Sequence, residues 1–448
     1  MDRTLIKDTV NKVGQTVKIS GYVQTKRDHG KIAFLDVADR SGIIQVFATG
    51  DLVVGVTPQC AVTIEGTIAA RPEKLVNENI ETGKIELQSV KVEILAKAQE
   101  LPFDMGQKEL DLQLPTLLDF RSLTLRHPRI KAIFKIHETV VDAFREGLQK
   151  QDFTEFQSPV IVGQTAEGGA DIFEVKYFDY KAYLSQSPQF YKQIMVGVFE
   201  RVFSVAKTLR AEPSVTTRHL TEITNLDAEM GFIESWTDVM DQAEYIVKYI
   251  FDRVDKECVV ELKMHGATTP KVSTKIPRIK LREAQQVIFD RTGRDNRNEP
   301  DLEPEDEREL CRWSAEEHGS DLLFVTHYPV KKRPFYTFED PEDLGYTLSF
   351  DLLGRGTEWL TGGQRINNLE KLEANAKEWG VDLQKSTLYM QAFQYGMPPE
   401  GGFSFGSERI VMHILGLANV REASLFPRDM ERVDIRLSTL KKDTPKKS

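Results

Sequence analysis

The sequence of 448 residues has few cysteines and no long apolar segment. Its three cysteines, Cys60, Cys258 and Cys311, are far apart and in no metal-ligand spacing, which excludes a disulfide framework and a cysteine-based metal centre. No apolar run is long enough to span a bilayer, and the first ten residues, MDRTLIKDTV, do not resemble a signal peptide. We therefore expect a protein of a reducing, cytoplasmic compartment with no membrane partner.

Several catalytic motifs are absent as well. No glycine run is followed by Lys and Ser or Thr in the spacing of a Walker loop, and no dinucleotide fingerprint is present. No Ser-His-Asp or Cys-His arrangement is apparent. A nucleotide substrate would then be held by arginines and a metal ion, which suits an in-line displacement at phosphorus.

The length and charge of the chain limit its organisation. A chain of 448 residues is too long for one core, so two or three domains are expected. The net charge of -10 argues against a general nucleic-acid coat and leaves room for local basic faces, such as Lys26-Arg27 and Lys31. The lysine-rich tail, residues 441–447, is expected to be a solvated end.

Residues 1–100 alternate apolar and polar in about five short runs, punctuated by Gly30, Gly42, Gly50 and Gly83. This pattern predicts a small closed β-barrel of the oligonucleotide-binding type. An aromatic, Phe34, and an amide, Gln45, could face outward there to contact unpaired bases, although Phe34 taken alone is better explained as a core residue.

A proline-containing linker is predicted at 101–127, and the second domain begins near residue 128. The apolar stripe of residues 131–150 predicts an amphipathic helix. The run that follows is a strand broken at Pro159, which indicates a sheet edge. Residues 263–320 are charged and carry little pattern, so we interpret them as an insertion.

Two strands between residues 202 and 230 each carry one polar face. On the second strand Asn225, Asp227 and Glu229 alternate with apolar residues. A face that mixes charges of both signs is suited to the floor of an active site. Before these strands, SQSPQFYK predicts a helix with Ser187 as its cap and Pro188 in its first turn, which puts Gln189 and Lys192 on one side.

The stretch from Asp351 to Arg365, DLLGRGTEWLTGGQR, predicts a tight hairpin. With Gly354 and Arg355 as the loop residues, Asp351 and Glu358 lie opposite each other. Such a like-charged pair is reasonable if a cation, in this case Mg²⁺, sits between the two carboxylates. The alternative is that one carboxylate faces solvent or pairs with Arg355. Arg365 is suited to holding a carboxylate by two hydrogen bonds.

Taken together, these features resemble the class II aminoacyl-tRNA synthetases, in particular the aspartyl-tRNA synthetases of the archaeal and eukaryotic type. Three motifs match in order: the helix and strand ending at Pro159, the Arg-x-Glu of 210–212, and GGFSFGSER ending at Arg409. The resemblance covers nearly the whole chain. It implies an α+β protein with an N-terminal OB-fold anticodon-binding barrel and a catalytic domain on an antiparallel sheet flanked by helices.

The resemblance also implies a role for each matched residue. Arg210 would bind the α-phosphate of ATP, Glu212 the adenine amino group, and Arg409 the γ-phosphate, and these three are the predicted catalytic residues. The remaining residues are grouped by ligand: Arg218, His219 and Glu358 for ATP; Asp351, Glu358 and Thr361 for Mg²⁺; Glu167, Ser187, Gln189, Lys192, Asp227, Thr361 and Arg365 for L-aspartate; Arg27, Phe34 and Gln45 for the anticodon.

The sequence departs from the family pattern at four places. Ile223 stands where relatives have a phenylalanine that stacks on adenine, and Glu400 where many have a histidine near the substrate. Ser404 and Ser407 replace commoner small or apolar residues. From these departures we expect a weak or altered affinity for ATP.

The function implied is ATP-dependent formation of aspartyl-adenylate and transfer of aspartate to tRNA(Asp) by a homodimer. Gln24 stands where relatives restricted to tRNA(Asp) often carry a bulky aromatic, which favours charging of tRNA(Asn) as well. Asparaginyl and lysyl relatives are not expected to carry Lys192. An inactive tRNA-binding paralogue is disfavoured by the intact arginines and carboxylates, and an enzyme that amidates aspartate would not need the barrel.

Overall fold

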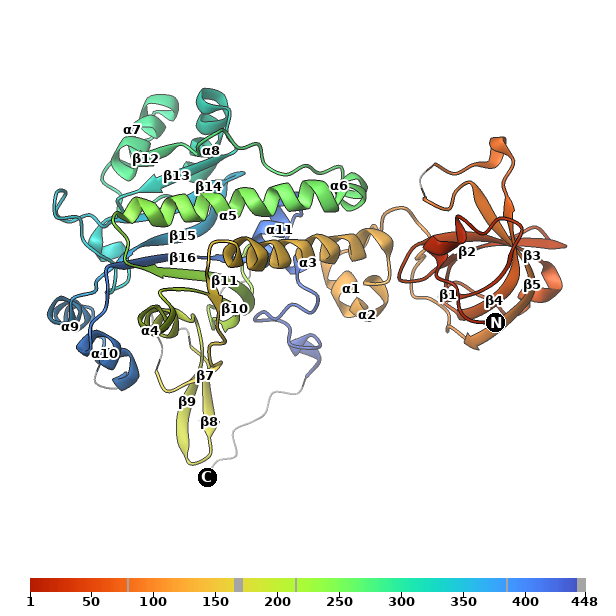
Figure 1. Ribbon diagram of the computed structural model, residues 1–448, viewed down its shortest axis with the longest axis horizontal. Helices are drawn as coiled ribbons and strands as arrows, with labels where there is room; N and C mark the ends of the chain where they lie inside the picture. Colours follow the sequence, from red (N-terminus) through yellow and green to blue (C-terminus); the bar gives the residue numbers. More distant parts are fainter. Residues whose placement is uncertain (79, 165–171, 214–215, 384–385, 441–448) are drawn as a thin grey trace. The chain divides into compact units, whose positions relative to one another are not determined.

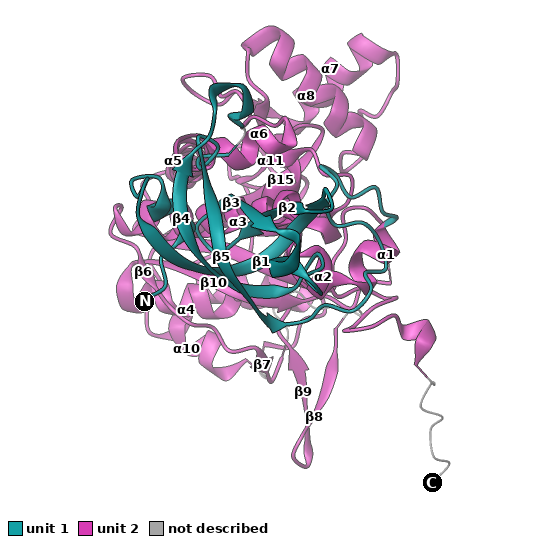
Figure 2. Cartoon of the chain, turned by 90° about the vertical axis from the view of Figure 1, so that its right-hand side faces the viewer, with its two compact units in different colours: residues 1–113 teal, residues 114–448 magenta. Residues whose placement is uncertain are grey.

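The computed structural model describes residues 1–78, 80–164, 172–213, 216–383 and 386–440. The chain forms two compact units, Met1–Gln113 and Leu114–Ser448 (Figure 2). The predicted linker, 101–127, is therefore divided between them, and its second half is helical, with α1 (Leu114–Asp119) and α2 (Arg121–Thr124). No helix of the described residues has the length and apolar character needed to cross a membrane.

The first unit is a closed five-stranded barrel, as its alternating sequence predicts. The strands follow the order β1-β2-β3-β5-β4 around the barrel. Every second side chain points inward to a core that includes Val17, Ile19, Leu35, Val46 and Ile64. The five strands have these bounds: β1 Thr16–Asp28, β2 Ile32–Ala38, β3 Ile43–Thr49, β4 Ala61–Ala70 and β5 Ile85–Ala96.

The second unit is built on an eight-stranded sheet in the order β12-β13-β14-β15-β16-β11-β10-β6. Its central strands are antiparallel, and the two edge pairs, β12 with β13 and β6 with β10, are parallel. The strands have these bounds: β6 Thr154–Glu155, β10 Arg201–Leu209, β11 Glu222–Gly231, β12 Arg278–Lys280, β13 Leu322–Thr326, β14 Ser349–Gly354, β15 Thr357–Arg365 and β16 Glu400–Gly406.

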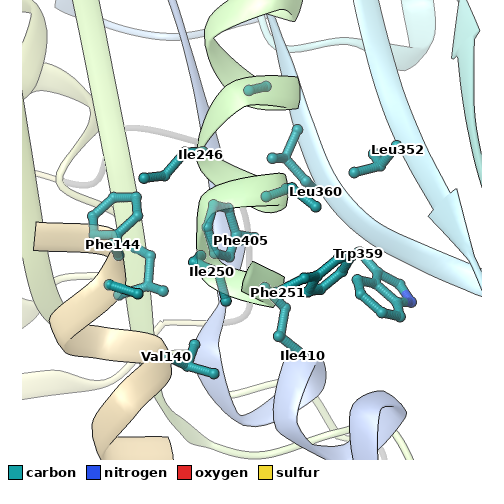
Figure 3. Close-up of a cluster of buried hydrophobic side chains, with 14 of the residues drawn as sticks. Val140, Phe144, Ile246, Ile250, Phe251, Leu352, Trp359, Leu360, Phe405 and Ile410 are labelled. Atoms are coloured by element: carbon teal, nitrogen blue, oxygen red, sulfur yellow. The ribbon is translucent and has the colours of Figure 1, made fainter. Parts of the chain in front are cut away.

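Helices α3 (Pro128–Gln149) and α5 (Trp236–Glu257) run beside each other along one face of this sheet (Figure 1). Their apolar stripes and the inward side chains of the strands form the main core, with Val140 and Phe144 from α3 and Ile246 and Ile250 from α5 (Figure 3). Leu360 and Phe405 meet them from β15 and β16. Since this face is filled with apolar side chains, the polar groups of the same strands lie on the opposite face.

The remaining elements of the second unit surround that sheet. Strands β7, β8 and β9 form a separate small sheet. Segment 263–320, predicted to be an insertion, contributes β12 to the main sheet and packs α7 and α8 on its far end. The bounds are: α4 Gln189–Phe199, α6 Val259–His265, α7 Leu281–Thr292, α8 Pro304–His318, α9 Leu369–Glu378, α10 Thr387–Gln394, α11 Ser407–Leu415, β7 Ile161–Val162, β8 Glu174–Tyr177 and β9 Tyr180–Leu184.

The hairpin of β14 and β15 forms, but its predicted register is wrong. Gly354 pairs with Thr357, so the loop residues are Arg355 and Gly356, both with positive φ, as a two-residue hairpin turn requires. A bulge beside Trp359 then shifts the ladder, so that Asp351 lies opposite Thr361 and not opposite Glu358.

Candidate functional site

The polar face of the sheet is continuous across four central strands. In β11 and β16, Asp227 pairs with Ser404, and in β16 and β15, Ser404 pairs with Thr361. Thr361 pairs in turn with Asp351 on β14. Cross-strand partners project to the same side, so the acidic groups predicted on β11 and on the hairpin share one surface.

Lys192 and Arg365, which the sequence predicts to read an aspartate side chain, contact the same carboxylate. Lys192 Nζ lies 3.0 Å from Glu229 Oε2, and Arg365 Nε donates to Glu229 Oε1 at 2.7 Å. Lys192 also donates to Asp227 Oδ1 at 3.1 Å. All four side chains are buried. The structure thus brings together two cations from α4 and β15, which are far apart in the chain.

The two acidic groups of this network differ in their electrostatics. Burial opposes ionisation of Glu229, but Arg365 and Lys192 outweigh it and leave its pKa lowered. For Asp227 burial prevails over the attraction of Lys192, and its pKa is raised. Glu229 is therefore the firmly ionised member, and it holds both cations in place.

Glycine at position 402 makes room for this arrangement. A Cβ at Gly402 would lie 2.0 Å from Glu229 Oε2 and 2.2 Å from the carbonyl oxygen of Ala228. The guanidinium of Arg365 donates to the Gly402 carbonyl oxygen at 3.0 Å. The backbone of β16 therefore acts as one wall of the charged pocket.

Helix α4 begins one residue later than its sequence predicts. Its first residue is Gln189 and its N-cap is Pro188, so the prediction of Ser187 as the cap is wrong by one position. Ser187 Oγ still accepts from the backbone N–H of Gln189 at 3.2 Å. The Gln189 side chain donates to Gln193 Oε1 at 3.0 Å. Glu167, also predicted to bind aspartate, lies outside the described residues.

A cavity of ≈ 160 Å³ lies over β11, β15 and β16 and the first turn of α11. Its lining includes three arginines, Arg210, Arg218 and Arg409, together with Glu358 and Thr361. The helix N-terminus and three guanidinium groups give this cavity the character of a site for phosphate groups. Ile223 also lines it, which agrees with an apolar contact at that position.

The other predicted ATP residues lie beside this cavity. Glu212 Oε1 is 3.6 Å from Arg210 Nη1, and Glu212 Oε2 is 3.5 Å from His219 Nε2. Arg409 Nη1 donates to the backbone carbonyl oxygen of Glu358 at 3.0 Å. Three contacts thus join five of the six predicted residues, and the sixth, Arg218, lines the cavity.

Asp351 of the hairpin contacts a half-buried arginine, Arg333, that the sequence pattern did not mark. Arg333 Nη2 donates to Asp351 Oδ2 at 2.7 Å, and Nη1 to Thr361 Oγ1 at 3.2 Å. The guanidinium also lies over the ring of Tyr328, 3.9 Å from its centroid. Burial and the neighbouring Asp351 raise the pKa of Glu358 to about 7.

Two alternatives for these carboxylates are excluded by the same contacts. Asp351 is buried, and Arg355 donates instead to the carbonyl oxygens of His413 and Thr268.

Glu307 is a second missed residue: its Oε2 lies 3.3 Å from Arg218 Nη1. Arg333 and Glu307 come from segments without clear periodicity, so no sequence signal marked them.

The three predicted anticodon residues share the outer face of the barrel. Arg27 pairs across the strands with Phe34, and Phe34 with Phe47. Arg27 Nη2 donates to Gln45 Oε1 at 3.3 Å. Phe34 is half-buried on this outer face, so the alternative that it is a core residue is wrong.

Two of the departures from the family pattern have partners in the structure. Ser407 Oγ lies 2.8 Å from His137 Nε2, which connects α3 to the start of α11. Glu400 is fully buried and accepts from Gln193 Nε2 at 2.8 Å. Neither departure disturbs the arginines of the cavity.

Comparisons with known families agree with this arrangement of two units. The family model described as "tRNA synthetases class II (D, K and N)" matches residues 113–430. The model described as "OB-fold nucleic acid binding domain" matches residues 17–95. The two matches follow the boundary between the compact units.

Individual relatives match over almost the whole chain. The Aspartate--tRNA(Asp/Asn) ligase of Thermus thermophilus is 43% identical over 433 residues, covering 96% of this chain and 99% of the relative. The Aspartate--tRNA(Asp) ligase of Pyrococcus horikoshii is 36% identical over 430 residues, covering 94% and 96%.

Solved structures of two kinds are similar to the whole chain. A putative aspartyl-tRNA synthetase from Leishmania major superposes with a TM-score of 0.87 at 30% identity, covering 96% of this chain and 94% of that one. The asparaginyl-tRNA synthetase from Pyrococcus horikoshii, in complex with asparaginyl-adenylate, superposes with a TM-score of 0.86 at 30% identity, covering 97% and 99%.

Proposed function

Since the chain belongs to the class II tRNA synthetases of the D, K and N group, we propose that it is an aspartate--tRNA ligase. It activates L-aspartate with ATP to aspartyl-adenylate and pyrophosphate, and it transfers the aspartyl group to the terminal adenosine of tRNA(Asp). The similarity to ligases named for both tRNAs, and Gln24 at a bulge of β1, support tRNA(Asn) as a second acceptor.

The observation that carries this proposal is the shared contact of Lys192 and Arg365 with Glu229. Two cations held side by side in a buried pocket suit a side chain that ends in a carboxylate. Both cations are already paired with protein carboxylates, so a substrate would share them: its carboxylate would accept charge-assisted hydrogen bonds from them, whereas a neutral amide would accept weaker ones, a difference on the order of 1 to 3 kcal/mol. The overall fold does not distinguish aspartate from asparagine, but this pocket chemistry favours aspartate.

The roles of the substrate residues follow from the two ends of the polar face. Lys192 and Arg365 take the aspartate side chain, with Asp227, Ser187, Gln189 and Glu167 around its remaining groups. The arginine-lined cavity takes the triphosphate, with Arg210 at the α-phosphate and Arg409 at the γ-phosphate. Glu212 meets the adenine amino group, and Arg218 and His219 complete the site. Because both ends lie on one sheet face, the aspartate carboxylate can approach the α-phosphorus.

The residues at the hairpin fit a magnesium ion. Asp351 Oδ1 is buried and has no hydrogen-bonding partner among the described residues. Mg²⁺ is held by one or two carboxylates and by substrate phosphates, which agrees with the lack of any cluster of three His, Cys, Asp or Glu side chains in the part of the chain described. Asp351, Glu358 and Thr361 would hold it, and it would neutralise charge on the phosphates.

On the barrel, Arg27, Phe34 and Gln45 bind the anticodon by ion pairing, stacking and hydrogen bonding.

We also infer a homodimer that uses α3 and β6, and a cytoplasmic location. Size-exclusion chromatography with light scattering tests the dimer, and a monomeric mass at micromolar concentration would exclude it.

The reaction is tested by exchange of labelled pyrophosphate into ATP. Aspartate, and neither asparagine nor lysine, should stimulate exchange by the purified protein. Stimulation by asparagine instead would point to an asparaginyl enzyme, and no exchange with any of the three would exclude a catalytic role. Charging of purified tRNA(Asp) and tRNA(Asn) side by side then defines the acceptors.

A further inference from the structure

Glu400 is a buried acid next to the pocket that has no part in the proposed reaction. It is the first residue of β16, opposite Arg365 on β15 and Gly231 on β11. Its side chain is fully buried. A carboxylate in such a place must either be balanced by a cation or carry a proton.

Among the described residues, the two cations that act on Glu400 are already paired with other carboxylates. The two nearest positive groups, Lys192 and Arg365, already contact Glu229, and Lys192 also contacts Asp227. Two cations thus balance two carboxylates without Glu400. The carboxylate of Glu229 lies close enough to disfavour a further negative charge, and both burial and Glu229 raise the pKa of Glu400 well above its usual range.

The hydrogen bonds of Glu400 connect it to the residues around the substrate. Gln193 donates to Glu400 Oε1 at 2.8 Å. The amide oxygen of Gln193 accepts from Gln189 Nε2 at 3.0 Å and from the hydroxyl of Tyr389 at 3.0 Å. Since the Gln193 amide has one donor side and one acceptor side, its bond to Glu400 fixes which side faces Gln189.

We propose that Glu400 is protonated in the working protein and is a positioning residue: as a neutral acid it orients Gln193 and Gln189 while adding no charge to the aspartate pocket. This inference rests on the proposed function, because it assigns Gln189 to the amino-acid site. It explains how an acid can stand beside a pocket that receives a dicarboxylic substrate. An ionised Glu400 would repel the incoming carboxylate.

Each charged group that faces Glu400 either disfavours its ionisation or is already bound to another carboxylate. Glu229 on β11 disfavours its charge, and Lys192 on α4 and Arg365 on β15 favour it but are bound to Glu229. Tyr389 on α10 is neutral, because burial raises the pKa of its hydroxyl well above the usual range. The acid therefore stays neutral as long as the Lys192–Glu229–Arg365 contacts persist.

The protonation state can be measured directly by infrared spectroscopy of the full-length protein at neutral pH. We expect the spectrum of wild type minus Glu400→Gln to contain the C=O band of a protonated carboxylic acid, shifted in D₂O. The matched control is Glu373→Gln, which makes the same chemical change at an exposed position of α9 and should give only carboxylate bands. Carboxylate bands alone in the Glu400 difference spectrum would overturn the proposal.

The positioning role is tested by the KM for aspartate in pyrophosphate exchange. Glu400→Gln mimics the neutral acid and should keep this KM within about threefold of wild type, whereas Glu400→Ala removes the acceptor for Gln193 and should raise it more than about tenfold. If Glu400 is ionised, Glu400→Gln instead lowers the KM by about tenfold or more, since a repelling charge is lost. Should Glu400→Ala fail to fold, the KM of Glu400→Gln and the infrared spectrum still distinguish a neutral Glu400 from an ionised one.

These outcomes separate the two proposals. A wild-type protein without aspartate-dependent exchange would exclude the proposed function, and the infrared spectrum would still report the state of Glu400. A wild-type protein that exchanges with aspartate, but whose Glu400 bears carboxylate bands, would retain the function and exclude the inference.

Discussion

Arg365 and Glu229 form a buried ion pair, with Nε 2.7 Å from Oε1 and both side chains less than one tenth exposed. From the sequence alone, Arg365→Leu is expected to abolish exchange and leave the fold intact. The buried ion pair adds a loss of stability to that expectation. Removing the guanidinium leaves Glu229 with only Lys192, so the variant should also lose about 3–5 kcal/mol of stability.

A double variant separates the two effects. Arg365→Leu with Glu229→Gln removes the uncompensated charge and should regain most of the lost stability, while aspartate-dependent exchange stays absent. All four tryptophans lie in the second unit, so urea unfolding followed by tryptophan fluorescence reports that unit alone. Recovery of exchange in the double variant would show that Arg365 does not bind the substrate.

Arg333 forms an ion pair with Asp351, a carboxylate that we assign to the metal site. Removal of Arg333 should therefore increase the shift in thermal midpoint that Mg²⁺ causes in the substrate-free protein. Arg333→Met leaves Asp351 without the cation that it contacts and should destabilise the second unit by about 3 kcal/mol in chelator. Added Mg²⁺ should restore part of this by binding the folded state.

The measurement is the thermal midpoint with chelator and with millimolar Mg²⁺. Arg312→Met is the matched control, because Arg312 is exposed on α8 and its partner, Glu309, keeps a second cation in Arg291. A magnesium shift in Arg333→Met no larger than that of wild type would argue against a cation site at Asp351.

His413 should make the stability of the second unit depend on pH. Burial, together with Arg409 and Arg218, lowers its pKa to about 3 in the folded protein. In the unfolded chain it titrates near 6.5, so the unfolded state gains a proton first as pH falls, and stability is lost progressively below about pH 6.5. The loss is about 1.4 kcal/mol per pH unit, or roughly 2 kcal/mol between pH 7.5 and 5.

His413→Phe keeps a ring over Trp359, on which His413 stacks, and should remove this part of the pH dependence. Urea unfolding at pH 7.5 and 5 checks it, with His318→Phe on the exposed side of α8 as the control. Equal loss of stability at pH 5 in wild type and His413→Phe would contradict the assignment.

Arg27 should affect tRNA binding without a change in the catalytic unit. Its ion pair with Asp36 is half-exposed and contributes at most about 1 kcal/mol to the barrel. Arg27→Ala should raise the KM for tRNA in aminoacylation by about tenfold or more, with a weaker salt dependence. Lys74→Ala, at an exposed position of the same barrel, is the control, and an equal effect of both variants would mean that no specific contact is lost.

The sequence predicts individual helices and strands better than the contacts between them. Alternation along residues 1–100 is enough to predict the barrel, and the three-to-four spacing of Ile133, Ile136 and Val140 is enough to predict α3. The period of two in Asn225, Asp227 and Glu229 correctly marked a polar sheet face. Local patterns carry these features because each depends on one element only.

What the sequence could not supply depends on contacts between distant segments. The turn at Arg355-Gly356 places Glu358 opposite Leu353, the bulge beside Trp359 then places Thr361 opposite Asp351, and no residue type announces a bulge at that site. Arg333 lies in an irregular stretch, so its position against Asp351 follows only from the fold. Glu229 was assigned to the correct face, but its contact with both Lys192 and Arg365 needed the packing of α4 over the sheet.

The close approach of Glu229 to Gly402 has a consequence for how this gene can vary. Every other amino acid would place a carbon against Glu229, so even alanine should separate the two cations and weaken aspartate activation. In a saturation library selected for growth on this enzyme alone, we expect codon 402 to tolerate nothing but glycine.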